Sequence, residues 1–138
     1  MENRERIIII GGDEDSQGRW KEKMASRFEI RCVSLQEEAY EIFGRDGNWN
    51  AVVVRAFVAP RRNTPYDPHS YKMFNTGTLI GYIREAYPHI PIFGSCLESK
   101  CADMIDAGCV ATAGVLDLMD TIEAFFSREP VGMPIVIS

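Results

Sequence analysis

Hydrophobic and polar positions along the chain alternate between two periods. Continuous β-branched apolar runs predict buried strands, and apolar residues three or four positions apart predict amphipathic helices. Strands are predicted at residues 7–10, 29–33, 51–54, 90–93 and 110–113. Helices are predicted around Trp20, Met24 and Phe28, from Ser34 to Gly44, over residues 78–87, from Ser95 to Ala107, and around Leu118, Ile122 and Phe125. Five β–α units therefore follow one another.

Two of these helices have an N-terminal signature. The segments 34–37 and 95–98 each read Ser-x-x-Glu, the capping-box pattern, in which a hydroxyl and a carboxylate satisfy backbone amides of the first turn. We expect helices to begin at Ser34 and at Ser95.

The alternation of strands and helices predicts an α/β fold. Consecutive β–α units form a parallel sheet with right-handed crossovers and helices on both faces, a three-layer α/β/α sandwich. A length of 138 residues fits one domain, which we place at residues 1–138. The apolar residues 133–137 are compatible with an extra C-terminal edge strand, a packed tail or a dimer contact.

The regular pattern breaks between residues 58 and 74. Pro60, Pro65 and Pro68 disfavour a long helix there, and loops of this length in compact domains are often functional. Exposed aromatic residues and Met are frequent in interfaces. Candidate partner-binding residues are Tyr66, His69, Tyr71, Met73 and Phe74, with ordinary packing over the end of the sheet as the alternative.

Charge and hydropathy narrow the classes of function. The net charge of −5 and the pI near 5.0 argue against a nucleic-acid-binding surface. No apolar run approaches the roughly 20 residues that span a bilayer, and no signal-peptide core is evident. We expect a cytoplasmic protein that binds neither nucleic acid nor membrane.

The four cysteines, Cys32, Cys96, Cys101 and Cys109, form no Cys-x-x-Cys pair. The favoured interpretation is that they are small buried hydrophobic residues in a reducing compartment. A reactive thiol at Cys96 is the alternative.

Three segments resemble the receiver domains of two-component response regulators. Residues 76–92 are similar to the third helix and fourth strand of that family, and residues 107–109 to its turn into the fifth strand. Residues 7–10, followed by an acidic loop, resemble its first strand and its metal-binding carboxylates. The resemblance covers most of residues 5–127. It implies a flavodoxin-like sheet of strand order 2-1-3-4-5 and raises the question of aspartyl phosphorylation.

Two of the groups that phosphorylation needs are missing. The resemblance places Arg55 at the acceptor position, or Ala56 in the other register, and no Asp or Glu occurs between residues 50 and 66. A guanidinium stays protonated and is no nucleophile. Val115 stands near the position of the family's lysine, and no lysine follows Lys100.

The two remaining requirements have partial candidates. Asp13 and Asp15 approximate the carboxylates that would hold Mg²⁺, but the favoured interpretation is a solvated loop whose acidic residues suit the N-terminus of the next helix. Ser95, or Cys96 in a shifted register, supplies the family's side chain after the fourth strand, and a helix cap is the alternative for Ser95. Arg55 is also placed to form an ion pair with Asp13 or Asp15 in the old pocket, or to reach solvent instead.

Three functions stay open. The first is a non-phosphorylatable pseudo-receiver, a signalling module that binds a protein partner and also has a possible homodimer contact. The second is an atypical phosphorelay receiver, in which Mg²⁺ would be the cofactor. The third is a small-molecule-binding or enzymatic flavodoxin-like domain at the carboxyl ends of the strands. Only the second and third imply catalysis, and the first needs no cofactor.

Overall fold

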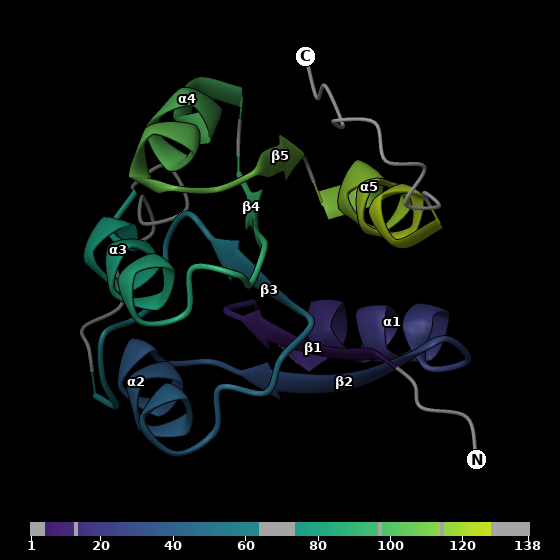
Figure 1. The fold of residues 1–138 in the computed structure, drawn as a ribbon, viewed down its shortest axis with the longest axis horizontal. Coiled ribbons are helices and arrows are strands. Elements are labelled where there is room, and N and C mark those ends of the chain that lie inside the picture. Colours follow the sequence, from purple (N-terminus) through teal and green to yellow (C-terminus); the bar gives the residue numbers. More distant parts are fainter. Residues whose placement is uncertain (1–4, 13, 64–73, 97, 114, 128–138) are drawn as a thin grey trace.

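A computed structural model of the chain describes residues 5–12, 14–63, 74–96, 98–113 and 115–127. Strands and helices alternate along these residues, as the sequence predicts (Figure 1). The strands are β1 (Glu5–Ile10), β2 (Phe28–Val33), β3 (Ala51–Arg55), β4 (Ile92–Ser95) and β5 (Ala111–Ala113). The helices are α1 (Glu14–Met24), α2 (Gln36–Arg45), α3 (Gly77–Ala86), α4 (Glu98–Ala107) and α5 (Val115–Ser127).

All the paired strands run parallel, in the order β2-β1-β3-β4-β5. This confirms the predicted fold class and strand order. β3 lies at the centre of the sheet, where its continuous apolar run is covered on both faces. Parallel strands bring their carboxyl ends to one edge of the sheet, and the functional question concerns that edge.

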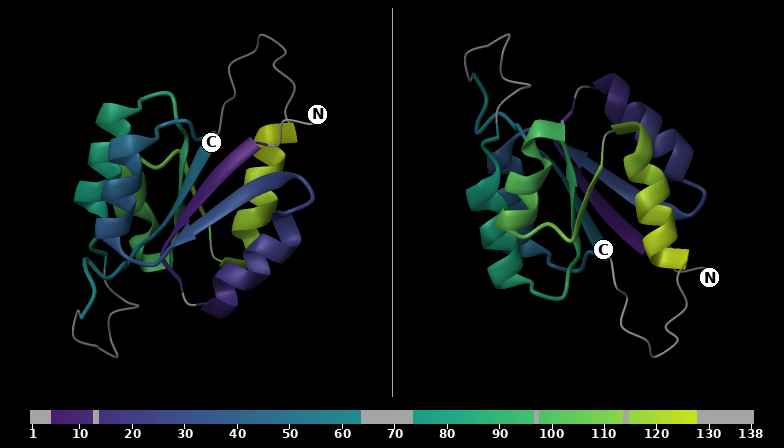
Figure 2. Two further views of the ribbon diagram at one scale, coloured as in Figure 1. Left: turned by 90° about the horizontal axis from the view of Figure 1, so that it is seen from below. Right: turned by 90° about the horizontal axis from the view of Figure 1, so that it is seen from above.

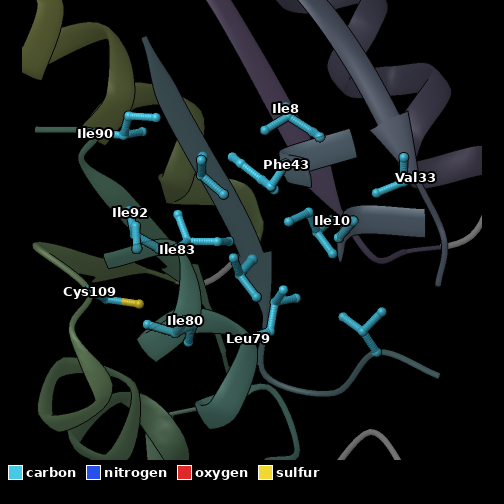
Figure 3. Close-up of a cluster of buried hydrophobic side chains, with 14 of the residues drawn as sticks. Ile8, Ile10, Val33, Phe43, Leu79, Ile80, Ile83, Ile90, Ile92 and Cys109 are labelled. Atoms are coloured by element: carbon cyan, nitrogen blue, oxygen red, sulfur yellow. The ribbon is translucent and has the colours of Figure 1, made fainter. Parts of the chain in front are cut away.

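The sheet separates two hydrophobic cores (Figure 2). Helices α2, α3 and α4 cover one face, and α1 and α5 cover the other. Side chains alternate along β1 and β3. Ile8, Ile10, Val52 and Val54 therefore enter the core under α2, α3 and α4. Figure 3 shows Ile8 and Ile10 there, together with Phe43, Leu79, Ile80 and Ile83. Ile7, Ile9, Ala51 and Val53 enter the opposite core, with Trp20, Met24, Leu118 and Ile122.

The boundary between α1 and β2 differs from the prediction. Phe28 continues the spacing of Trp20 and Met24 and was expected in the helix, but α1 ends at Met24 and Phe28 begins β2. All three side chains are buried in the same core. Phe28, at the start of β2, therefore packs in the core that it would also have reached from one more turn of α1.

The start of α2 differs by two residues. The helix begins at Gln36, with Leu35 at the N-cap and no side-chain cap hydrogen bond. The carboxylate that accepts backbone N–H groups is that of Glu38, from Ser34 at 3.2 Å and from Leu35 at 3.0 Å. The predicted capping box therefore has its acidic half one residue later, and Ser34 lies outside the helix.

The two ends of the β3–α3 connection are fastened together. The Asn75 side chain accepts the Val58 N–H and donates to the Val58 carbonyl, both at 2.9 Å. The buried Gln36 amide donates to the carbonyls of Val58 at 2.9 Å and of Asn75 at 3.3 Å. This neck holds the connection against the N-terminus of α2. Residues 64–73 and the predicted edge strand at 133–137 lie outside the described residues.

Candidate functional site

The carboxyl ends of β3 and β4 meet at the position where the receiver resemblance places a phosphoacceptor. Arg55 is the last residue of β3, one residue beyond the predicted strand, and pairs with Ser95, the last residue of β4. Ala56 follows, and its N–H donates to the Ser95 carbonyl at 2.9 Å. The structure therefore brings Arg55, Ala56 and Ser95 together, and neither register supplies a carboxylate there.

Arg55 is half-buried beside the end of β1. It forms no ion pair with any carboxylate in the described part of the chain, and Asp15 is exposed. The predicted pairing with Asp15 is therefore wrong. Asp15 is close in sequence to the end of β1, but its position in the sequence does not reveal that its side chain lies on the solvent side of α1. Asp13, the other predicted partner, lies outside the described residues.

Gly11 and Gly12 directly follow β1, in the region that the receiver resemblance compares with metal-binding carboxylates. Both adopt positive φ angles, of 103° and 94°, which L side chains rarely adopt. A Cβ on Gly11 would meet Val58 Cγ2 at 2.9 Å and Arg55 Cβ at 3.1 Å. The side chains of Val58 and Arg55 therefore leave no room for a carboxylate at Gly11. The sequence signalled this only as two consecutive glycines, and the closeness of Arg55 to Gly11 could not be predicted from it.

Thr76 is a site residue that the sequence reading missed. It is completely buried, and its hydroxyl lies 2.9 Å from the Arg55 carbonyl and 3.1 Å from the Ala56 carbonyl. The N–H of Asn75 donates to the same Ala56 carbonyl at 2.9 Å. The backbone after β3 is thus fixed by the residues that precede α3. A threonine two residues before a predicted helix was the available signal.

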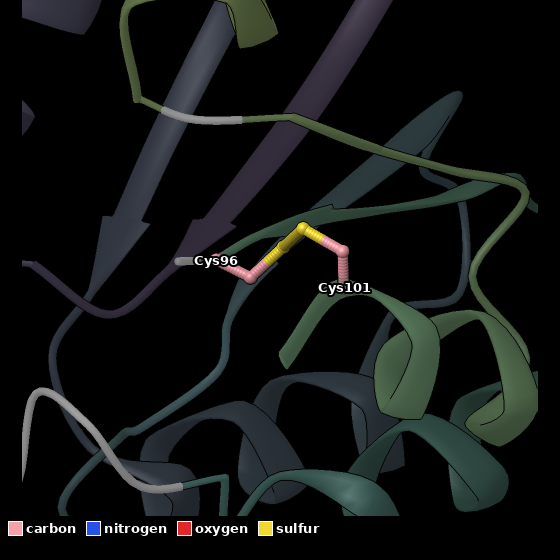
Figure 4. Close-up of a disulfide and its surroundings, with 2 residues drawn as sticks. All are labelled: Cys96 and Cys101. Atoms are coloured by element: carbon pink, nitrogen blue, oxygen red, sulfur yellow. A yellow bond between two sulfur atoms is a disulfide. The ribbon is translucent and has the colours of Figure 1, made fainter. Parts of the chain in front are cut away.

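The segment after β4 corrects two predictions. Ser95 belongs to the strand and is buried, and α4 begins only at Glu98, so Ser95 does not cap the helix. Backbone pairing with Arg55 and Ala113 extends β4 to this residue. Cys96 follows and is bonded to Cys101 of α4 (Figure 4), whereas the favoured interpretation held all four cysteines to be buried thiols. Only Cys109 fits that description fully.

The side chains of most other predicted site residues lie outside the described part of the structure. Val115 is the first residue of α5, directly after the carboxyl end of β5, but its side chain lies outside the described residues. So do the loop candidates Tyr66, His69, Tyr71 and Met73. Phe74 is described and half-buried, and it packs against the core under α2 and α3. That contact is the packing alternative for this one aromatic residue.

The described residues contain no cluster of three or more His, Cys, Asp or Glu side chains that could hold a metal ion. A hollow of about 290 Å³ lies between β2 and α2, lined by charged residues of both signs that include Arg31, Glu38 and Asp46. It is not at the carboxyl edge of β3, where open α/β sheets bind ligands. No helix within the described ranges has the length and apolar character needed to cross a membrane.

Comparison with known proteins identifies the fold. No family model matches the chain, and no curated protein is significantly similar to it. Among solved structures, the non-phosphorylated HemR receiver domain from Leptospira biflexa matches with a TM-score of 0.70 at 13% identity, covering 91% of this chain and 97% of that chain. A two-component response regulator from Clostridium difficile matches with a TM-score of 0.69 at 16% identity, covering 91% and 98%. A receiver domain protein from Clostridium thermocellum matches with a TM-score of 0.67 at 13% identity, covering 94% and 99%.

The chain has the receiver-domain fold. The match spans nearly the whole of each receiver structure, so the order β2-β1-β3-β4-β5 belongs to that architecture as a whole. On the receiver fold, the end of β3 carries Arg55 and Ala56, and the adjoining end of β1 carries Gly11. The fold is retained while these positions lack carboxylates.

Proposed function

We propose that this chain is a non-phosphorylatable receiver-fold domain that acts as a protein-interaction module in signal transduction, in the cytoplasm. The observation that carries the proposal is that the end of β3 holds closely packed side chains and no nucleophile. Arg55 stands at the acceptor position, and its Cβ and Cγ would each lie 3.1 Å from a Cβ on Gly11. Charge, backbone conformation and space all disfavour a phosphorylated state.

The argument against phosphoryl transfer is electrostatic and steric. Transfer depends on a positioned nucleophile and on neutralisation of the phosphoryl charge, which Mg²⁺ provides in many sites. An arginine is permanently protonated and offers no lone pair for attack. Ala56, the alternative acceptor, is buried and carries no nucleophile. Asp15 is exposed and makes no ion pair with Arg55, so it leaves the pocket without a described carboxylate.

A constitutive interaction role fits the rigidity of the same region. Thr76 and Asn75 hold the backbone carbonyl groups after β3, so this edge has a defined conformation without a ligand. The family resemblance places the signalling surface around α4 and β5. On that surface Ile105 is 44% exposed and Val110 is 42% exposed. Large exposed apolar side chains are what a protein partner would cover.

The test is incubation with acetyl phosphate and Mg²⁺, followed by intact-mass measurement. A receiver domain that carries the acceptor aspartate is the positive control for the reagent. We expect no phosphoryl adduct on this chain and no change in amide hydrogen exchange across α4 and β5. A phosphoryl adduct would contradict the proposal and favour the atypical phosphorelay, with Mg²⁺ as its cofactor.

A further inference from the structure

A covalent bond joins the carboxyl end of β4 to the first turn of α4. Cys96 follows the last residue of β4, and Cys101 is the fourth residue of α4. The two sulfur atoms are bonded, with a Cα–Cα distance of 5.7 Å (Figure 4). Disulfides in proteins usually have Cα–Cα distances of about 4.4–6.8 Å, so the backbone is already positioned for the bond. Cys96 lies beside Ser95, at the edge that holds Arg55.

The other two cysteines, Cys32 and Cys109, are free thiols. Cys109 is buried, and burial raises the pKa of its thiol to about 12. Burial also raises the pKa of the Cys32 thiol, and Lys21 offsets part of that effect. Since the thiolate is the species that attacks disulfides, both residues are poorly suited to exchange. The chain thus has one bonded pair at a strand–helix junction and two protected thiols elsewhere.

We propose that Cys96 and Cys101 form a reversible thiol–disulfide site that exchanges with low-molecular-weight disulfides and thiols of the glutathione class. In the oxidising direction, one thiolate attacks the small disulfide, forms a mixed disulfide and releases one small thiol. The second cysteine then attacks the mixed disulfide and releases the second small thiol. Two electrons and two protons pass from the protein to the small disulfide. Reduction by two small thiols reverses both steps.

The surroundings of the bond favour reversibility over a purely structural role. The bonded residues are only five positions apart, so the bond restricts the unfolded chain far less than one that closes a long loop. In the cytoplasm, where the proposed function places the chain, disulfides are usually transient and redox-sensing. Both properties point to a bond whose state follows the local thiol–disulfide ratio.

The disulfide attaches the N-terminal end of α4 to the end of β4. The other end is held without it, because Met104 is fully buried and the N–H of Cys109 donates to its carbonyl at 3.1 Å. A Cβ on Gly94 would lie 3.0 Å from the Met104 sulfur, so helix and strand are closely packed there. Reduction would therefore free the first turn of α4 while the second half of the helix stays docked on β4.

The experiment is equilibration of the purified full chain in glutathione buffers of graded oxidised-to-reduced ratio. Acid quenching, alkylation and intact-mass measurement then count the thiols. We expect a single reversible transition in which two alkylatable thiols are lost as the buffer becomes oxidising and are regained with dithiothreitol. Cys32→Ser is the matched control, and it should leave that transition in place.

A second variant and a second measurement separate this site from accidental oxidation. In Cys101→Ser, Cys96 should stop at the mixed disulfide with glutathione, visible as one added glutathione per chain. In the wild-type chain, hydrogen exchange should rise on reduction in the first turn of α4 and stay unchanged around Met104. The proposal is overturned if both thiols remain alkylatable at every ratio, or if mixed disulfides dominate in the wild-type chain. Failure of excess dithiothreitol to reduce the bond in the folded chain would also overturn it. None of these results depends on whether acetyl phosphate modifies the chain.

Discussion

At the scale of single residues, Gly11 shows how closely the end of β1 is packed against β3. The Gly11 N–H donates to the Val33 carbonyl at 2.8 Å, and the Gln17 side-chain amide donates to the Gly11 carbonyl at 3.0 Å. With φ at 103°, a Cβ on Gly11 would be strained and would meet the side chains of Val58 and Arg55, which fill the space beside it. An acidic residue introduced at this position would therefore clash with its neighbours.

Substitution of Gly11 tests this interpretation. We expect Gly11→Ala to lower the free energy of unfolding by about 1–3 kcal/mol, because an L residue at this φ is strained and its Cβ meets Val58. Gly18 in α1 is the matched control, since it is exposed and nothing lies within 4 Å of a Cβ there. Gly18→Ala should raise stability by about 0.5–1 kcal/mol, as expected for a helix interior. Urea denaturation of both variants measures the two signs, and a neutral Gly11→Ala would contradict the steric argument.

The position of Arg55 could be predicted from the sequence, but its surroundings could not. An apolar run that ends in a charged residue marks the end of a buried strand, and Arg55 is indeed the last residue of β3. Its neighbours Gly11 and Thr76 come from segments 44 and 21 residues away. Such contacts follow from sheet register and loop path, which a linear pattern of residue types does not contain.

At the scale of elements, the β3–α3 connection depends on a small polar cluster. Asn75 mimics a strand partner for Val58 by accepting its N–H and donating to its carbonyl. The Gln36 amide N–H also bonds that carbonyl, so the carbonyl has a second partner while the Val58 N–H has no other described one. The amide of Val58 is therefore the group most sensitive to loss of Asn75.

Truncation of this side chain should open the neck. We expect Asn75→Ala to cost about 1–3 kcal/mol of unfolding free energy, because a part-buried N–H is left without a partner. Hydrogen exchange at Val58 should accelerate in the same variant. Asn50→Ala is a suitable comparison, since Asn50 also accepts a backbone N–H, from Arg6 at 2.8 Å, but at an exposed position. Equal losses in the two variants would show that the neck is not special.

Element types could be predicted along the described chain, whereas some element boundaries could not. Leu79, Ile80 and Ile83 are fully buried, as the helical spacing indicates. Phe28 and Ser95 were assigned to helices and belong to strands. In both cases a local pattern, an i+4 spacing or a Ser-x-x-Glu motif, competed with pairing to a neighbouring strand. Backbone pairing decided the outcome, and that information is not local.

At the scale of the whole molecule, the alternation of periods was sufficient for the architecture. Buried apolar runs, each followed by an amphipathic helix, leave few topologies once right-handed crossovers are required. The order of the strands was carried by the family resemblance. The Cys96–Cys101 bond was not anticipated, because spacing alone does not say whether two cysteines face each other across a strand–helix junction.

The burial of Cys109 links the integrity of the fold to alkaline pH. Its thiol has a pKa of about 12 in the folded chain, against an ordinary value of 9.0, because burial disfavours the thiolate. The unfolded chain therefore releases this proton first as the pH rises. The contribution to stability is complete below pH 9.0 and is lost progressively as the pH approaches about 12.

This sign can be isolated by comparing two chains in a background of Cys96→Ser and Cys101→Ser, where no disulfide can exchange. One chain keeps Cys109 and the other carries Cys109→Ala. We expect the difference in unfolding free energy between them to be constant below pH 9 and to shrink above it, as followed by urea titration at each pH. Cys32→Ala in the same background should give a smaller change, because Cys32 is only half-buried and Lys21 partly offsets its burial. Parallel stability curves for the Cys109 pair would mean that the core under α3 and α4 admits water at this cysteine. The close packing of α4 against β4 would then need another explanation. The expected restriction of the disulfide's effect to the first turn of α4 depends on that packing.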